Sequence, residues 1–159
     1  MIALSEDAWL LGDEEWAKCA GDAAQLAAKV TADEEGRVKE GSLSYCEHMK
    51  ELPASVGRLQ ALQTLNLRSC LGLTSLPAEV GNCVKLESLY LNKCSGLTSL
   101  PAEVGSCVKL ESLDLGGCSG LTSLPDLSGL EKLEVHNLPK AMKPWEERGR
   151  KAFALPTEG

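Results

Sequence analysis

Large rings are scarce in this sequence, because Phe, Trp and Tyr together make up only 4% of its 159 residues. A core therefore has to be built mainly from Leu, Val, Ala and Cys rather than from aromatic side chains. Hydrophobic residues still amount to 43% of the chain, and a chain of this length can bury a sizeable core. We expect one ordered domain rather than a disordered protein.

Positive charge is also in short supply, with 16 Lys and Arg against 23 Asp and Glu and a net charge of −7. Nucleic-acid binding requires a concentrated basic surface that neutralises phosphates. No apolar run approaches the roughly 18 residues of a membrane span, and the first residues lack the basic and apolar blocks of a secretory signal. These absences predict no nucleic-acid partner and no membrane insertion.

The seven cysteines form no C-x-x-C pair, which argues against a zinc knuckle and a thioredoxin-type motif. Six of them recur at intervals of 24 residues, a regularity that indicates packing rather than disulfides or metal binding. The sequence also lacks an N-x-S/T sequon. We therefore expect no cofactor and no metal, and a reducing compartment such as the cytoplasm.

A 24-residue repeat organises the centre of the chain. Units starting at Leu62, Leu86 and Leu110 each read L-x-x-L-x-L-x-x-C-x-x-L-x-x-L-P, in which L-x-L alternates as a half-buried strand does. Residues 38–61 form a degenerate first unit, and the unit after Pro125 is four residues shorter. About five repeats are thus predicted over residues 38–138.

This pattern resembles that of the leucine-rich repeat family. Cysteine stands where many members of that family have asparagine, at Cys46, Cys70, Cys94 and Cys118. The resemblance implies an α/β fold, a right-handed solenoid with a short parallel sheet on its concave face and short helices or loops on its convex side. The convex segments fit this expectation, because Val80 and Cys83 stand three residues apart, as on one side of a helical turn.

The two ends differ from the repeats. Residues 1–37 carry nine acids against three bases and predict an acidic helical cap, with a short helix around Trp9 and a second helix over residues 13–30. Residues 139–159 predict a basic, loop-like cap or tail in which Trp145 and Phe153 seal the core. An exposed docking helix at the first end and a partner-binding tail at the second are the alternatives.

Polar residues that alternate with the strand leucines are expected to point out of the concave face. They form three columns: Glu40, Thr64, Ser88, Ser112 and Lys132; Ser42, Asn66, Tyr90, Asp114 and Glu134; and Ser44, Arg68, Asn92, Gly116 and His136. These positions vary between repeats whereas the core positions do not. A variable surface on a constant scaffold is typical of the extended binding faces of solenoids.

The predicted partner-binding residues are Thr64, Asn66, Arg68, Ser88, Tyr90, Asn92, Lys93, Ser112, Asp114, Glu134 and His136. Tyr90, flanked by Arg68 and Asn92, is the expected anchor, since Tyr and Arg are enriched at binding hot spots. A sheet face that is merely solvated is the alternative.

Catalysis is not expected. Ser112, Asp114 and His136 are the one triad-like set on this face, but an open sheet offers neither burial nor an oxyanion pocket. The sequence also contains no G-x-G-x-x-G and no phosphate-binding G-x-x-x-x-G-K motif. We predict a non-catalytic protein-interaction module that binds a protein partner through its concave face. The alternative is a permanent structural or accessory subunit of a larger assembly, docked by its termini or its convex side.

Overall fold

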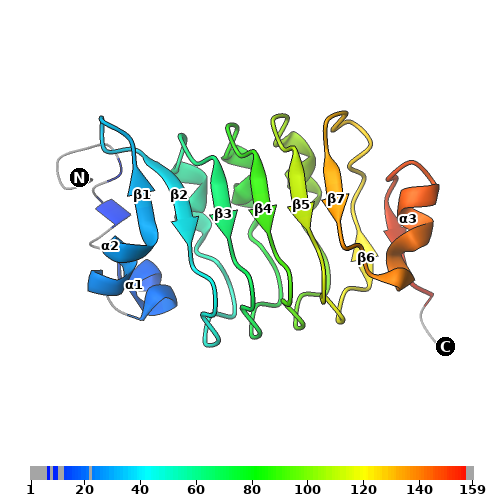
Figure 1. Ribbon diagram of the computed structural model, residues 1–159, viewed down its shortest axis with the longest axis horizontal. Coiled ribbons are helices and arrows are strands. Elements are labelled where there is room, and N and C mark those ends of the chain that lie inside the picture. Colours follow the sequence, from blue (N-terminus) through cyan, green and yellow to red (C-terminus); the bar gives the residue numbers. More distant parts are fainter. Residues whose placement is uncertain (1–6, 8, 11–12, 22, 157–159) are drawn as a thin grey trace.

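The computed structural model describes residues 7, 9–10, 13–21 and 23–156 and shows a solenoid with a six-stranded sheet along one face and short helices behind it (Figure 1). The strand order is β1-β2-β3-β4-β5-β7, and all neighbours from β2 onward are parallel. The strands are β1 (Val30–Ala32), β2 (Val38–Ser42), β3 (Thr64–Asn66), β4 (Ser88–Tyr90), β5 (Ser112–Asp114) and β7 (Glu134–His136). The solenoid and its parallel sheet confirm the predicted fold class. Among the described residues, no helix has the length and apolar character to cross a membrane.

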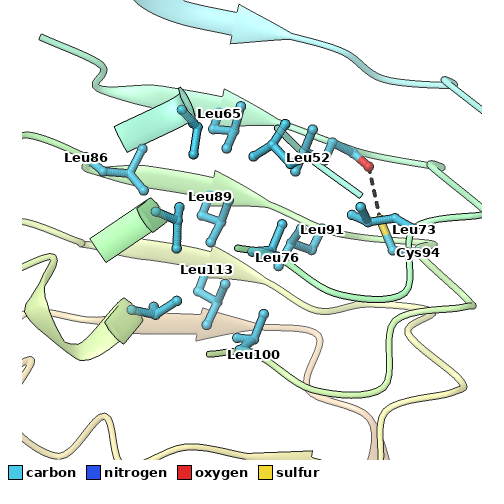
Figure 2. Packing of buried hydrophobic residues seen from close by; sticks show 14 of the residues in the cluster. Leu52, Leu65, Leu73, Leu76, Leu86, Leu89, Leu91, Cys94, Leu100 and Leu113 are labelled. Carbon is cyan, nitrogen blue, oxygen red and sulfur yellow. Dashed lines mark hydrogen bonds between the residues drawn. The ribbon is translucent and has the colours of Figure 1, made fainter. Parts of the chain in front are cut away.

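Leucine columns form the core between the sheet and the opposite side. Leu65, Leu89 and Leu113 are paired directly across β3, β4 and β5, and each is at most 1% exposed (Figure 2). A second buried column contains Leu52, Leu76 and Leu100. Full burial of one such side chain stabilises the fold by about 1.5–3 kcal/mol, so the stacked leucines provide most of the driving force.

The convex side consists of 3-10 helices that follow the Leu-Pro pairs: η2 (Ala54–Arg58), η3 (Ala78–Asn82) and η4 (Ala102–Ser106). Each begins directly after a proline, whose fixed φ suits the residue before a helix. Each also buries one valine against the core, namely Val56, Val80 and Val104. The predicted apolar turn is therefore confirmed.

Neighbouring coils approach each other closely at a recurring glycine. A Cβ atom added to Gly96 would lie 2.8 Å from the carbonyl oxygen of Leu71, closer than real Cβ contacts. The equivalent Gly120 stands in the same relation to the Ser95 oxygen, at 2.5 Å. Glycine is required at this position because the backbone of the preceding coil occupies the space of a side chain.

The periodic cysteines pack inside the solenoid as free thiols. Five of them donate their thiol to a main-chain oxygen 27 residues earlier, at 3.0–3.4 Å: Cys70 to Leu43, Cys83 to Val56, Cys94 to Leu67, Cys107 to Val80 and Cys118 to Leu91. Burial raises the pKa of Cys83 to about 12 and that of Cys94 to about 11. The predicted packing role is confirmed, since each of these five thiols joins one coil to the coil before it.

The last strand pairs two residues away from the predicted register. Glu134, not Lys132, lies opposite Ser112, and His136, not Glu134, lies opposite Asp114. The prediction is wrong because side chains in a strand alternate with period two, so a two-residue slip keeps every residue on its face. The C-terminal segment also contacts this region, since the Arg150 guanidinium donates to the Leu133 carbonyl at 2.6 Å, just before β7.

The N-terminal segment contains two helices, α1 (Glu14–Ala20) and α2 (Ala23–Lys29), so the single helix predicted over residues 13–30 is wrong. Gly21 ends α1 with a φ of 111°, a conformation that favours glycine. The polar stretch after α2 is part of a hairpin, in which β1 pairs antiparallel with β2. Trp9 and Leu10 lie in a 3-10 turn, and residues 5, 6, 8, 11 and 12 of the first predicted helix lie outside the described residues.

These N-terminal elements cover the first coil, residues 38–61. Trp16 is 2% exposed, and its indole Nε1 donates to Ser55 Oγ at 2.8 Å. The buried carboxylate of Asp7 accepts a hydrogen bond of 2.8 Å from the backbone N–H of Val38, at the start of β2. Trp16 and Leu26 belong to the same core as the repeat leucines.

Residues 139–156 of the C-terminal segment form regular elements, contrary to the loop-like prediction. They form η5 (Lys140–Met142), α3 (Lys143–Glu147) and β8 (Phe153–Ala154), and β8 pairs antiparallel with β6 (Ser123–Leu124). Trp145 is fully buried and donates from Nε1 to the Pro125 oxygen at 2.9 Å. Phe153 is half-buried against the core. Both aromatic residues thus pack where the sequence predicted them.

Candidate partner-binding face

The outward side of β3, β4, β5 and β7, together with the turns that follow β3 and β4, is called the sheet face below. It brings together the eleven predicted binding residues: Thr64, Asn66, Arg68, Ser88, Tyr90, Asn92, Lys93, Ser112, Asp114, Glu134 and His136. The mid-strand residues from Thr64 to Asp114 are half-buried, whereas Arg68, Lys93, Glu134 and His136 are exposed. Tyr90 lies near the middle, directly between Asn66 and Asp114.

Two of the predicted residues have a structural role at the strand ends. Asn66 Oδ1 accepts the N–H of Arg68 at 3.0 Å, and Asp114 Oδ1 accepts the N–H of Gly116 at 2.9 Å. Asn and Asp commonly bond to a backbone group two residues on, which holds the chain in a turn. Tyr90 stands at the same position of its repeat and cannot accept such a bond through its ring. Its side chain is therefore the one of the three with no role in the turn.

The turn after each strand places one residue in the left-handed conformation. Tyr45, Ser69 and Lys93 have φ values of 63°, 58° and 65°, and Gly117 has 71° at the equivalent position. Such values are uncommon for residues other than glycine. Ladder hydrogen bonds hold the turn, because the N–H of Tyr45 bonds to the Arg68 oxygen at 2.8 Å and that of Lys93 to the Gly116 oxygen at 2.6 Å.

Tyr45 is a candidate binding residue that the sequence reasoning missed. Its side chain is 63% exposed, and the Arg68 guanidinium lies 5.9 Å from its ring centroid, within the range of a cation–π contact. A sequence signal existed, because Tyr45 precedes Cys46 just as Lys93 precedes Cys94. The first coil thus extends the predicted cluster around Arg68.

The triad-like set is not assembled on this face. The Asp114 carboxylate bonds to Gly116 and lies 3.4 Å from the side-chain amide of Asn137. His136 is exposed, and its nearest ionic neighbour is Glu134, with Nε2 and Oε2 3.9 Å apart. No group of three or more metal-ligating side chains gathers anywhere in the described part of the chain.

Two hollows formed by the described residues lie away from the sheet face. One of about 500 Å³ lies beside α1 and is lined by Cys19, His48 and Pro53, among others. Another of about 430 Å³ lies where β8 pairs with β6. Small-molecule sites are usually concave and enclosed, whereas the sheet face is broad and open, as suits a macromolecular partner.

Comparison with known proteins places the chain in a family. A family model described as "Leucine-rich repeat region" matches residues 42–154, well over half of the chain. No curated protein sequence matches. The leucine-rich repeat domain of the type III effector XopL is similar at 30% identity over 64% of this chain and 34% of that one, with a TM-score of 0.58.

A leucine-rich repeat protein of Leptospira interrogans is 35% identical over 55% of this chain and 22% of that one, with a TM-score of 0.47. The chain thus spans about a fifth to a third of the length of these two proteins. The family match and the XopL domain agree with the leucine columns and the parallel sheet. The chain therefore belongs to the leucine-rich repeat family, whose fold generally mediates protein–protein interaction.

Proposed function

We propose that this protein is a non-catalytic interaction module that binds a protein partner through the sheet face. The observation that carries the proposal is a pair of tyrosines, Tyr90 half-buried at the centre of the sheet face and Tyr45 exposed at its edge beside Arg68. Tyr and Arg dominate binding hot spots, because they offer a large apolar area together with polar groups. The backbone around both tyrosines is fixed by ladder hydrogen bonds, so little ordering is required on binding.

Charge on the sheet face suggests how the partner is oriented. Arg68 and Lys93 are exposed after β3 and β4, while Glu134 on β7 is exposed on the far side of Tyr90. A partner with an acidic segment over β3 and β4 and a basic group over β7 complements this arrangement. Such complementarity sets register and speeds association more than it adds affinity.

The test is affinity purification of a partner with the wild-type chain, followed by titration of that partner against Tyr90→Ala and Arg68→Ala. Loss of a hot-spot residue costs about 2 kcal/mol or more, which corresponds to roughly 30-fold or more in Kd. Lys109→Ala is the control, because Lys109 is an exposed base outside the strands and turns of the sheet face. Unchanged Kd values for both sheet-face variants would refute the proposal.

The second candidate function is a permanent subunit that docks through another surface. It is favoured by Val84 and Val108, equivalent residues of successive repeats that are 46% and 72% exposed after η3 and η4. If the chain is such a subunit, the double variant Val84→Ser and Val108→Ser loses a stoichiometric partner that Tyr90→Ala retains. The opposite pattern supports recognition by the sheet face.

A further inference from the structure

Cys46 differs from the other periodic cysteines in its surroundings. Those thiols donate to the oxygen of a residue 27 positions earlier, in the preceding coil. Among the described residues no repeat coil precedes that of Cys46, and the residue 27 positions before it is Cys19 in α1. The contact of the Cys46 thiol with the Ser44 oxygen is long, at 3.9 Å. Its proton is therefore held less firmly than those of the cysteines in the following coils.

A cation takes the place of the missing coil. Lys29 at the end of α2 points its ammonium at Cys46, with Nζ 3.8 Å from Sγ, and also donates to the Ala20 oxygen at 3.0 Å. The second bond fixes the lysine against α1. A thiol beside a fixed ammonium is the environment in which cysteines become nucleophilic.

Cys19 and Cys46 line the same cavity, which lies between the N-terminal helices and the first coil. The cavity has a volume of about 210 Å³, and its titratable lining includes Lys18, Cys19, Lys29, Tyr45, Glu47 and His48 as well as Cys46. Cys46 lies at its wall and is 8% exposed. Two of its lining residues, Lys18 and Lys29, are lysines.

The electrostatics agree with this geometry. The neighbouring Cys70 thiol and the Lys29 ammonium both lower the pKa of Cys46, against the opposing effect of burial. Burial instead raises the pKa of Cys19 to about 11, and the charges of Cys46, Glu15 and Asp13 act in the same direction. The pKa values of the two cysteines that line this cavity are thus shifted in opposite directions, and Cys46 is the more acidic thiol.

We propose that Cys46 is a covalent modification site for small α,β-unsaturated carbonyl compounds that enter this cavity. The thiolate sulfur attacks the β-carbon and forms a C–S bond. The electron pair of the C=C bond moves to the α-carbon and carbonyl as an enolate, which then takes a proton from water. Lys18 and Lys29 favour this class of electrophile, because their positive charges stabilise the negative charge that develops on the enolate oxygen.

The test uses the full chain and N-ethylmaleimide, a small α,β-unsaturated imide, at one equivalent and pH 6. The labelled positions are mapped by peptide mass spectrometry after quenching. At that pH a thiol with an ordinary pKa of about 8.5 is about 0.3% thiolate, so Cys46 is expected to react about tenfold faster than any other cysteine. The proposal would be overturned by preferential labelling of Cys19, which is more exposed, or by equal labelling of Cys19 and Cys46.

Three variants separate activation from simple exposure. Lys29→Gln raises the midpoint of the pH–rate profile of Cys46, and Lys29→Arg, which keeps a cation, leaves it low. Lys85→Gln is the matched control, since Lys85 is an exposed lysine that does not line the cavity. The role of Lys29 is contradicted if the midpoint of the pH–rate profile is unchanged in Lys29→Gln. It is also contradicted if the midpoint rises in Lys29→Arg as much as in Lys29→Gln.

The chemical class is tested with acrolein and its saturated counterpart propanal. Acrolein is expected to leave an adduct on Cys46 that survives denaturation and is absent from Cys46→Ser. Propanal has no C=C bond and should leave no adduct on this sulfur. Equal modification of Cys46 by the two aldehydes, or none by acrolein, would exclude the proposed ligand class.

Discussion

Leu89→Ala is the substitution that most directly tests the leucine columns. Leu89 lies in the middle of β4, is fully buried, and is paired with Leu65 on one side and Leu113 on the other. Removal of its side chain leaves a cavity that touches two neighbouring coils. Because the stability of a solenoid depends on contacts between adjacent repeats, damage at a central repeat weakens both of its interfaces.

The magnitude follows from the burial of the side chain. A buried Leu→Ala change costs about 2–5 kcal/mol, the upper part of that range applying where the surroundings cannot collapse. For a domain of about 150 residues each kcal/mol lowers Tm by about 2–4 °C, so the expected loss is about 4–20 °C. The ladder on both sides fixes the backbone of β4, which favours the larger values.

The assay is thermal unfolding followed by circular dichroism, with Ser88→Ala as the matched control. Ser88 is the adjacent residue of the same strand and is half-buried on the sheet face, so its substitution is expected to change Tm by no more than about 2 °C. Equal midpoints for the two variants would show that the assignment of inward and outward positions along β4 is wrong.

Two further predictions concern the packing of the coils. Gly96→Ala should destabilise the fold by more than about 1 kcal/mol, since its Cβ would meet the preceding backbone, whereas Gly129→Ala, with nothing within 4 Å, should be near neutral in the same denaturation assay. Strand spacing of about 4.8 Å allows a disulfide between paired positions, so mild oxidation should crosslink Ser112→Cys with Glu134→Cys. Crosslinking of Ser112→Cys with Lys132→Cys instead, detected by peptide mapping, would restore the register predicted from the sequence.

The sequence predicts well those parts of the fold in which equivalent residues of successive repeats are buried in the same way. The leucines at Leu65, Leu89 and Leu113 share one environment, so their spacing alone predicts both the strand and its neighbours. The short strands β1 and β8 were not predicted, because they lie in segments without alternation and form through pairing with β2 and β6. The register of β7 failed for the related reason that alternation fixes a face but not a partner.

The candidate site was predictable to a similar extent. Alternation identified the outward residues of the sheet face, including Tyr90 and Arg68. It did not show that Asn66 and Asp114 hold the strand-end turns, because their hydrogen bonds depend on the backbone conformation two residues later. Tyr45 was missed for the same reason, since its exposure follows from a left-handed turn rather than from its place in a strand.

The constant 24-residue offset between β3, β4 and β5 makes each coil an interchangeable building block. A duplicate of residues 86–109 inserted after residue 109 would present to both of its neighbours the same surfaces that they contact now. The sheet face would lengthen by about 4.8 Å, the spacing of one added strand, while the two ends kept their own contacts. The length of the sheet face is therefore set by the number of units, independently of the chemistry at either end.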